Sequence, residues 1–204
     1  MMQNDVALQH SYPIDFIFKI TTLHDDFLVT DSTGHSLAYV KQKIFALKTA
    51  VKVLNNSVEQ RLNYHIMADK WLAFNMCYSF NNAQGNHVGK ILRKGVRSIW
   101  TATYEIHDAG NNPILNIKET NPWIKILDAL FNQIPIVGLL TGYFFHPKYT
   151  VSRLNGDILF FCTKEASLFG RKFKLTNECS VQNNEEELAI LGVIMMLLIE
   201  KNRG

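Results

Sequence analysis

The residues best suited to chemistry form a cluster of cations in the middle of the chain, within eight positions of one another: Lys90, Arg93, Lys94 and Arg97. Arginine binds phosphate oxygens through two parallel hydrogen bonds, and lysine adds a mobile point charge. Lys90 and Lys94 are four residues apart, which places them on one face of a strand. The cluster is therefore a candidate site for an anionic head group. The alternative is a solubilising hairpin whose charges protect an exposed edge.

A second candidate is the apolar segment from Ile134 to Phe145, which proline and glycine interrupt. As a membrane-contact loop it would bring large side chains to the acyl boundary, with Lys125 and Lys148 near the head groups. These large side chains are Leu139, Leu140, Tyr143, Phe144 and Phe145. The alternative is a plug that covers one mouth of the fold, because exposing so much apolar surface invites aggregation.

Two further basic groups alternate with apolar residues, as the outer face of a strand does. One comprises Lys41, Lys43 and Lys48, and the other comprises Arg171, Lys172 and Lys174. We interpret both groups as solvated strand faces.

Common catalytic motifs are absent from the sequence. It has no glycine-rich phosphate loop, no Gly-x-Ser-x-Gly elbow, no Cys-x-x-Cys pair and no His-Glu-x-x-His helix. The seven histidines are dispersed, and His107 adjoins a turn. We therefore expect no catalytic residue, no metal site and no cofactor. The alternative is an enzyme that assembles its site from distant strands.

The elements that must position these residues begin with an apolar segment near the end of the chain. Leu188 to Ile199 carries no polar side chain. A helix of this length spans roughly 18 Å, which is too short to cross a bilayer about 30 Å thick. It needs apolar partners on every side, and a closed barrel supplies them. Asn184 and Glu187 have the spacing of a capping box. Gly192 predicts a close approach by a strand backbone or a bulky ring.

Most of the remaining sequence consists of short alternations of apolar and polar residues between turns, which is typical of antiparallel β-structure. We expect about twelve strands, at Asp15–Thr21, Asp26–Thr30, Ser36–Lys43, Phe45–Leu54, Arg61–Ala68, Met76–Phe80, His87–Arg93, Ser98–His107, Ile114–Glu119, Tyr149–Arg153, Ile158–Thr163 and Arg171–Leu175. The spacing from Trp123 to Phe131 predicts one short helix. The fold class is therefore mainly β: a closed antiparallel barrel around a buried C-terminal helix. We expect one domain, 1–204, with its core at about 16–200.

Composition sets further bounds on function. The chain has 47% hydrophobic and 19% charged residues, which is ordinary for a globular protein. A net charge of +3 is too weak to indicate a nucleic-acid partner. The three cysteines lie far apart and are expected to be reduced thiols. The first residues lack the features of a signal peptide, so we expect a cytoplasmic location, with peripheral membrane association as a further option. We also expect a monomer.

Several short motifs occur in an order that is familiar from one family. They are Asp31 and Gly34 followed by Val40-Lys41-Gln42-Lys43 and Phe45, then Val88-Gly89-Lys90-Ile91 with Trp100 and Tyr104, then Val151-Ser152-Arg153 before Asn155-Gly156. Together with the terminal helix they resemble the LURP-one-related proteins of the tubby-like superfamily, which also includes the phospholipid scramblases. The resemblance runs from about Phe16 to Ile199. It implies a twelve-stranded antiparallel barrel around a central helix.

For function, the resemblance implies less than it does for the fold. Tubby domains are associated with phosphoinositide head groups, and scramblases with lipid movement, whereas the LURP-one-related branch has no settled activity. No motif here places the tubby lipid-binding residues. We expect a non-enzymatic module that binds an anionic lipid or phosphoinositide-like head group at a membrane surface. The alternatives are a protein-interaction scaffold and an enzyme with its site at the barrel mouth.

Overall fold

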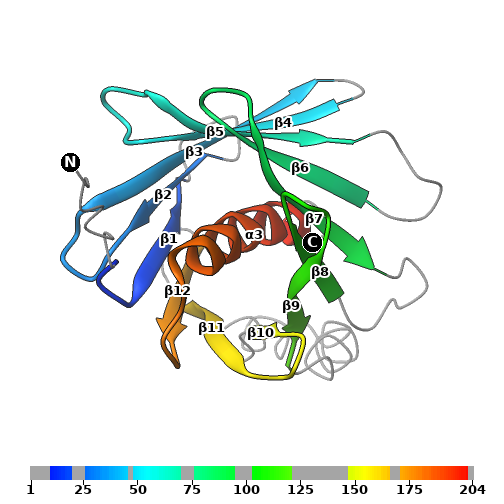
Figure 1. Ribbon diagram of the computed structural model, residues 1–204. Helices are drawn as coiled ribbons and strands as arrows, with labels where there is room; N and C mark the ends of the chain where they lie inside the picture. Colours follow the sequence, from blue (N-terminus) through cyan, green and yellow to red (C-terminus); the bar gives the residue numbers. More distant parts are fainter. Residues whose placement is uncertain are drawn as a thin grey trace, which may run out of the picture.

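Twelve antiparallel strands close into a barrel around one helix in the computed structural model (Figure 1). The structure describes residues 10–19, 26–45, 48–69, 76–94, 103–120, 147–165 and 171–201. The strands are β1 Ile14–Phe18, β2 Phe27–Thr30, β3 Ser36–Phe45, β4 Lys48–Leu54, β5 Leu62–Ala68, β6 Met76–Asn82, β7 His87–Lys94, β8 Thr103–Asp108, β9 Pro113–Glu119, β10 Lys148–Arg153, β11 Ile158–Glu165 and β12 Lys172–Asn177. The helix α3 is Asn183–Lys201. The predicted fold class is confirmed.

Each strand pairs with its neighbour in sequence, and β1 closes the barrel by pairing with β12. Every predicted strand has a counterpart, although residues 20–21 of the first, 46–47 of the fourth and 98–102 of the eighth lie outside the described residues. Phe45, which is predicted to begin the fourth strand, ends β3 instead. Positive φ angles occur in the turns between neighbouring strands, among them at Gly85 (84°), Asn111 (66°) and Gly156 (98°). These short turns therefore fix the register of their hairpins.

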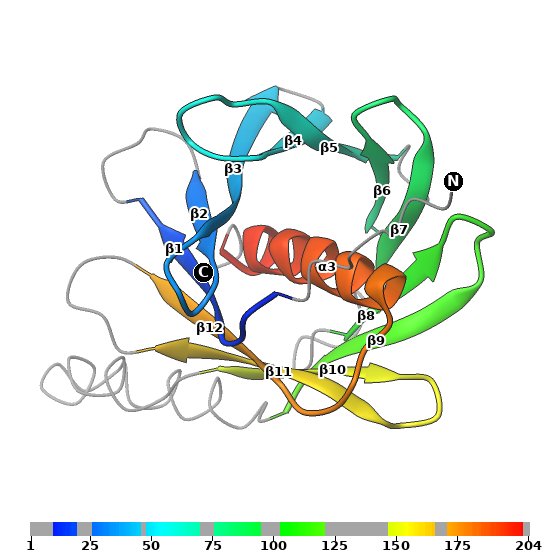
Figure 2. The same cartoon turned by 60° about the vertical axis from the view of Figure 1, so that its left-hand side comes forward.

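The helix α3 occupies the interior of the barrel (Figures 1 and 2). Its residues from Leu188 to Ile199 are buried except Ile190, which is partly buried and packs against the core. The barrel wall contributes large apolar side chains that water does not reach, among them Phe16, Phe27, Phe80 and Phe160. A helix without a polar face is therefore surrounded by sheet, as its sequence predicts.

The helix packs closest to β7, β8 and β9, and two glycines permit this approach. A Cβ atom at Gly89 would lie 2.7 Å from Cδ2 of Leu188, and one at Gly192 would overlap Cδ1 of Ile106. The close approach predicted at Gly192 is confirmed, but the predicted partner is wrong, because the branched side chain of Ile106 lies there and not a strand backbone or a bulky ring. A larger residue at Gly192 would have to displace the Ile106 side chain, and one at Gly89 would also meet the backbone oxygen of His107, 2.6 Å from the added Cβ.

Hydrogen bonds connect the first turn of α3 to three residues outside the helix, Arg153, Tyr12 and Tyr64. Arg153 donates two hydrogen bonds to Glu185, of 2.9 and 2.8 Å. The Tyr12 hydroxyl donates to Glu186 over 2.7 Å, and the Tyr64 hydroxyl donates to Glu187. Negative side chains also suit the positive end of the helix dipole.

The capping box predicted for Asn184 and Glu187 is wrong. The amide of Gln182 donates to the Glu185 carboxylate over 3.3 Å, so the contact between an acidic side chain and the N-cap amide lies two residues earlier. The side chain of Asn184 instead accepts a hydrogen bond from the next amide, that of Glu185. Glu187 is engaged by Tyr64 from the wall.

The two ends of the barrel differ. We call the end that holds the short turns and the first residues of α3 the turn end. We call the opposite end the mouth: there β9 and β11 finish, β10 and β12 begin, and α3 ends at Lys201. The connections 20–25, 46–47, 70–75, 95–102, 121–146 and 166–170 all join strands at the mouth, and they lie outside the described residues.

Candidate functional site

The predicted cationic cluster is divided between the two faces of β7. Lys90 and Lys94 share the outer face, as predicted, whereas Arg93 points into the barrel and is only 7% exposed. Arg97 lies outside the described residues. The alternation of a strand therefore separates Arg93 from its neighbour in sequence, Lys94.

Lys94 is engaged by a carboxylate on the next strand. It forms an ion pair with Glu105, which also lies 2.6 Å from Nε2 of His107. Partial burial raises the pKa of Glu105, but hydrogen bonds from Lys94 and His107 outweigh burial and lower it below its ordinary value. The outer face of β7 and β8 thus carries both signs of charge, which weakens its attraction for an anion.

Arg93 lies among aromatic side chains in the interior. Its cross-strand neighbours are Met76 and Tyr104, and its charge acts on the hydroxyls of Tyr78 and Tyr104. The Nε atom of Arg93 has no hydrogen-bond partner within the described ranges. This cation is therefore part of the barrel core and is not presented on the surface beside Lys94.

The basic group Arg171, Lys172 and Lys174, near the start of β12, also lies in two different environments. Lys172 binds Asp15 at 2.9 Å and Glu165 at 3.1 Å, and Lys174 binds Glu165. These two lysines form a solvated outer face, as predicted. Arg171 is different, because it is exposed and lines a pocket at the mouth. In the other basic group, Lys41 is half-buried and donates to Gln60 over 2.8 Å, while the side chains of Lys43 and Lys48 lie outside the described residues.

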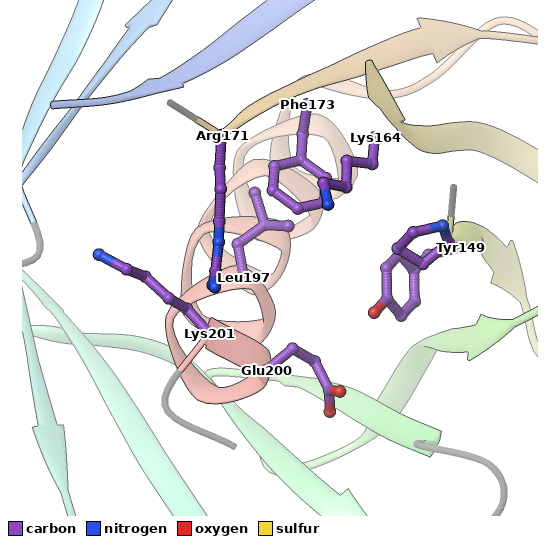
Figure 3. A pocket seen from close by; sticks show the side chains of 8 residues that line it. Tyr149, Lys164, Arg171, Phe173, Leu197, Glu200 and Lys201 are labelled. Carbon is purple, nitrogen blue, oxygen red and sulfur yellow. The ribbon is translucent and has the colours of Figure 1, made fainter. Parts of the chain in front are cut away.

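The mouth pocket, as we call it, has a volume of about 170 Å³ and lies where the last turn of α3 meets β10, β11 and β12. Figure 3 shows Arg171 and Phe173 beside the end of the helix, with Tyr149 across from them. The lining residues are Pro147, Tyr149, Lys164, Arg171, Phe173, Leu197, Glu200 and Lys201.

Strand alternation and helical spacing direct these side chains into the mouth pocket. In β11, Phe160 and Cys162 are fully buried, and Lys164 continues the same inward face as the strand reaches the mouth. On the helix, Leu197 and Lys201 are four residues apart and lie one turn above the other. The sequence analysis missed Lys164 as a site residue, although the run Phe160, Cys162, Lys164 carried the signal.

Three cations and one carboxylate surround the mouth pocket: Lys164, Arg171, Lys201 and Glu200. Glu200 accepts a hydrogen bond from the Tyr104 hydroxyl. Burial raises the pKa of Tyr104 and the neighbouring Glu200 raises it further, so the phenol stays protonated and remains a donor. Nζ of Lys201 lies 5.2 Å from the centre of the Phe18 ring. The balance of charge around the pocket is positive.

The described lining of the mouth pocket holds no histidine, cysteine, serine or threonine. The part of the chain that the structure describes contains no group of histidine, cysteine and acidic side chains arranged to hold a metal ion. The acid–histidine contact between Glu105 and His107 lies on the outer wall instead.

The apolar candidate segment Ile134 to Phe145 lies outside the described residues, and so does the predicted helix from Trp123 to Phe131. The described residues that flank this gap are Thr120 and Pro147, and Pro147 lines the mouth pocket. Among the helical residues that are described, none forms a helix long and apolar enough to cross a membrane.

Comparison with known proteins does not add a relative. No protein-family model, no curated protein and no solved structure matches this chain.

Proposed function

We propose that this chain is a non-enzymatic, tubby-like module of the LURP-one-related type that binds an anionic head group at a cytoplasmic membrane surface. The observation that carries the proposal is that Lys164, Arg171 and Lys201 all line one small pocket at the barrel mouth. These residues come from a strand, from the position before the next strand and from the helix end. The proposed site is therefore the mouth pocket, while Lys90, Lys94 and Arg97 stay a prediction.

The chemistry of the mouth pocket supports an anionic ligand. Arg171 offers a planar fork of donors that matches phosphate, and the two lysines add point charges. Phe173 and Leu197 give the pocket an apolar side, which suits the part of an amphiphile next to its head group. The competing role for these cations is to offset the negative end of the helix dipole. That role does not require them to face a shared pocket.

The position of the apolar segment is consistent with this proposal. Phe145 precedes Pro147 by two residues, and Pro147 lines the mouth pocket. We propose that Leu139, Leu140, Tyr143, Phe144 and Phe145 enter the acyl boundary while the head group occupies the pocket. Lys148 adds a charge at the same end of the barrel, with Nζ 3.6 Å from the centre of the Phe161 ring.

Vesicle flotation tests the proposal. We expect the chain to float with phosphatidylcholine vesicles that contain an anionic lipid and not with pure phosphatidylcholine vesicles. Each cation near a charged membrane contributes about 1 kcal/mol, so Arg171→Gln or Lys164→Gln should weaken binding roughly fivefold.

The matched control substitutions are Arg61→Gln, on an exposed residue at the turn end, and Lys118→Gln, on the outer face of β9. Both should bind like the unchanged chain. Equal flotation with neutral and anionic vesicles would overturn the proposal. Equal losses in the pocket and control variants would show that net charge, and not the mouth pocket, is responsible.

A further inference from the structure

We infer that Arg93 is the centre of a second anion site, on the inner wall at the mouth, which binds the carboxylate of an aliphatic monocarboxylic acid. This site is separate from the mouth pocket, because Arg93 does not line that pocket. The inference therefore goes beyond the proposed function and does not depend on it. It rests on the burial of Arg93, on its missing hydrogen-bond partner and on the residues around it.

Arg93 points into the barrel from the mouth end of β7. Gly89 and Ile91 precede it at two-residue spacing on the same inner face, and Gly89 lies against Leu188 of α3. The strand ends at the next residue, so Arg93 lies where the barrel opens. Its cross-strand neighbour Met76, the first residue of β6, is 42% exposed there. A ligand can approach Arg93 from this side.

The charge of Arg93 has no carboxylate partner in the described part of the chain. Only 7% of the residue is exposed, its Nε atom is buried without a hydrogen-bond partner, and none of the ion pairs between described residues includes it. A buried charge is costly unless an acceptor offsets its lost hydration. At the turn end, Arg153 is less buried and nevertheless binds Glu185 through two hydrogen bonds. A ligand would supply Arg93 with the equivalent acceptor.

A second donor beside Arg93 also lacks a strong acceptor. The charge of Arg93 acts on the hydroxyl of Tyr78, which is 9% exposed. That hydroxyl donates to the sulfur of Met76 at 3.9 Å, and a thioether is a weak acceptor. Burial raises the pKa of Tyr78 more than Arg93 lowers it, so the phenol keeps its proton at neutral pH. Tyr78 can therefore turn to an anion without losing a strong hydrogen bond.

One carboxylate matches these donors. It accepts two parallel hydrogen bonds from a guanidinium edge, such as that of Nε and one Nη atom, and has acceptor capacity left for Tyr78. Its single negative charge balances the single cation, whereas a phosphate monoester carries about −1.5 to −2 at neutral pH. Excess negative charge is disfavoured here, because Tyr104, the other cross-strand neighbour of Arg93, holds the Glu200 carboxylate nearby.

The surroundings of Arg93 suit an aliphatic chain attached to the carboxylate. Its cross-strand neighbours are the aromatic ring of Tyr104 and the thioether of Met76. Methionine is unbranched and polarisable, which lets it pack against chains of varied shape. A chain that extends from the carboxylate toward the mouth would cover the exposed part of Met76 and gain apolar burial.

The competing role for Arg93 is to offset the negative charge of Glu200 and of the carbonyl end of α3. That role needs no ligand, and it predicts that an apolar residue at this position lowers stability. The proposed site predicts the reverse for the chain without ligand. Replacing an unpaired buried charge with an apolar side chain of similar size removes the cost of desolvating the charge.

Calorimetric titration of the full chain with sodium octanoate at pH 7, below its micelle concentration, tests the site. We expect one octanoate to bind per chain, acetate to bind more weakly and octanol not to bind. Arg93→Met should weaken octanoate binding at least about tenfold, as expected for one lost charge-assisted hydrogen bond. Tyr78→Phe should weaken it by a smaller factor. The control Arg61→Met removes the same charge from an exposed residue at the turn end and should bind like the unchanged chain.

Urea denaturation shows whether Arg93→Met fails to bind only because it is misfolded. Without octanoate, the urea midpoint of Arg93→Met should equal or exceed that of the unchanged chain. Octanoate should raise the midpoint of the unchanged chain and of Arg61→Met, and should leave that of Arg93→Met where it is, because only a chain that binds the ligand is stabilised by it.

Three results would overturn the inference. The first is equal binding of octanoate and octanol, or octanoate binding that Arg93→Met leaves unchanged. The second is a lower midpoint for ligand-free Arg93→Met together with no effect of octanoate on the unchanged chain, which would assign Arg93 the structural role. The third is equal affinity for acetate and octanoate, which would exclude an aliphatic acid. These titrations contain no vesicles, so their failure leaves the proposed function to its own flotation test.

Discussion

The hydroxyl group of Tyr104, on the wall strand β8, donates a hydrogen bond to Oε1 of Glu200 in the last turn of α3. This contact connects the core of the barrel to the lining of the mouth pocket, because Tyr104 is fully buried and Glu200 faces the pocket. At the opposite end, Tyr12 and Tyr64 bind Glu186 and Glu187. Phenol–carboxylate pairs therefore attach α3 to the wall at both ends.

Removal of the Tyr104 hydroxyl should destabilise the fold. In Tyr104→Phe the Glu200 carboxylate loses a buried donor, and a hydrogen bond to a charged group contributes about 1.5 to 3 kcal/mol. Urea denaturation measures the loss. The matched control is Tyr78→Phe, because the Tyr78 hydroxyl donates to the sulfur of Met76, at 3.9 Å, which is a weaker acceptor than a carboxylate. Equal stabilities of the two variants would contradict the importance of the Glu200 contact.

The same pairs predict a loss of stability in alkali. Burial raises the pKa of Tyr12 and of Tyr64 above the ordinary value of 10.0, and the adjacent glutamates raise them further. Below pH 10 these phenols are protonated in both the folded and the unfolded chain. Above it the unfolded chain loses their protons first, so the free energy of unfolding falls as pH rises.

Urea denaturation between pH 8 and pH 11 would measure this fall, with tyrosinate absorbance reporting ionisation. The variant Tyr12→Phe should be less stable at pH 8 and should show a shallower decrease above pH 10, because one of the shifted phenols is gone. An unchanged slope would show that the Tyr12 phenol does not contribute to the linkage.

The close contact between α3 and β8 predicts that Gly192→Ala is destabilising. The added methyl group would overlap Cδ1 of Ile106, a side chain with 0% exposure. Overpacking of a core costs about 1 to 3 kcal/mol. The variant Ile106→Val removes the overlapping carbon and alone costs about 0.5 to 1.5 kcal/mol.

The double variant tests the geometry directly. If the two side chains meet as described, Gly192→Ala with Ile106→Val should be more stable than the sum of the single losses predicts, by at least about 0.5 kcal/mol. Additive losses, measured by urea denaturation, would mean that α3 does not pack against β8 at this point.

The barrel was predictable from the sequence because its determinants are local and periodic. Strand alternation, glycines in turns and a helix without a polar face each act over a few residues, and all of them indicate the same architecture. The position of Gly192 also predicted a close contact. Its partner, Ile106, depends on how the helix is placed inside the barrel, and no local pattern specifies that placement.

The mouth pocket was not predictable in the same way. Lys164, Arg171 and Lys201 are separated in the chain and meet only because the barrel closes around α3. Arg93 and Lys94 show the opposite case, in which residues close in sequence are separated in space. They are adjacent in sequence, yet strand alternation sends one into the core and the other to the surface. Proximity along a strand is therefore a poor guide to a shared site.

Cysteine reactivity gives a final prediction that depends on local contacts. Burial, together with the bond to Oδ2 of Asp69 at 3.2 Å, raises the pKa of the Cys77 thiol to about 12 despite the nearby Lys90. Burial alone raises the pKa of the fully buried Cys162 to about 12. At pH 8 on the order of one in ten thousand of these thiols is the reactive thiolate.

A thiol reagent at pH 8 should therefore label Cys179 first in the folded protein, since Cys179 is half-buried and the other two thiols have raised pKa values. All three cysteines should react at similar rates in denaturant. The variant Asp69→Asn removes the negative acceptor and should accelerate labelling of Cys77, whereas Cys162 should stay protected by its burial. Labelling of Cys77 as fast as Cys179 in the unchanged chain would show that the contact with Asp69 does not persist in solution.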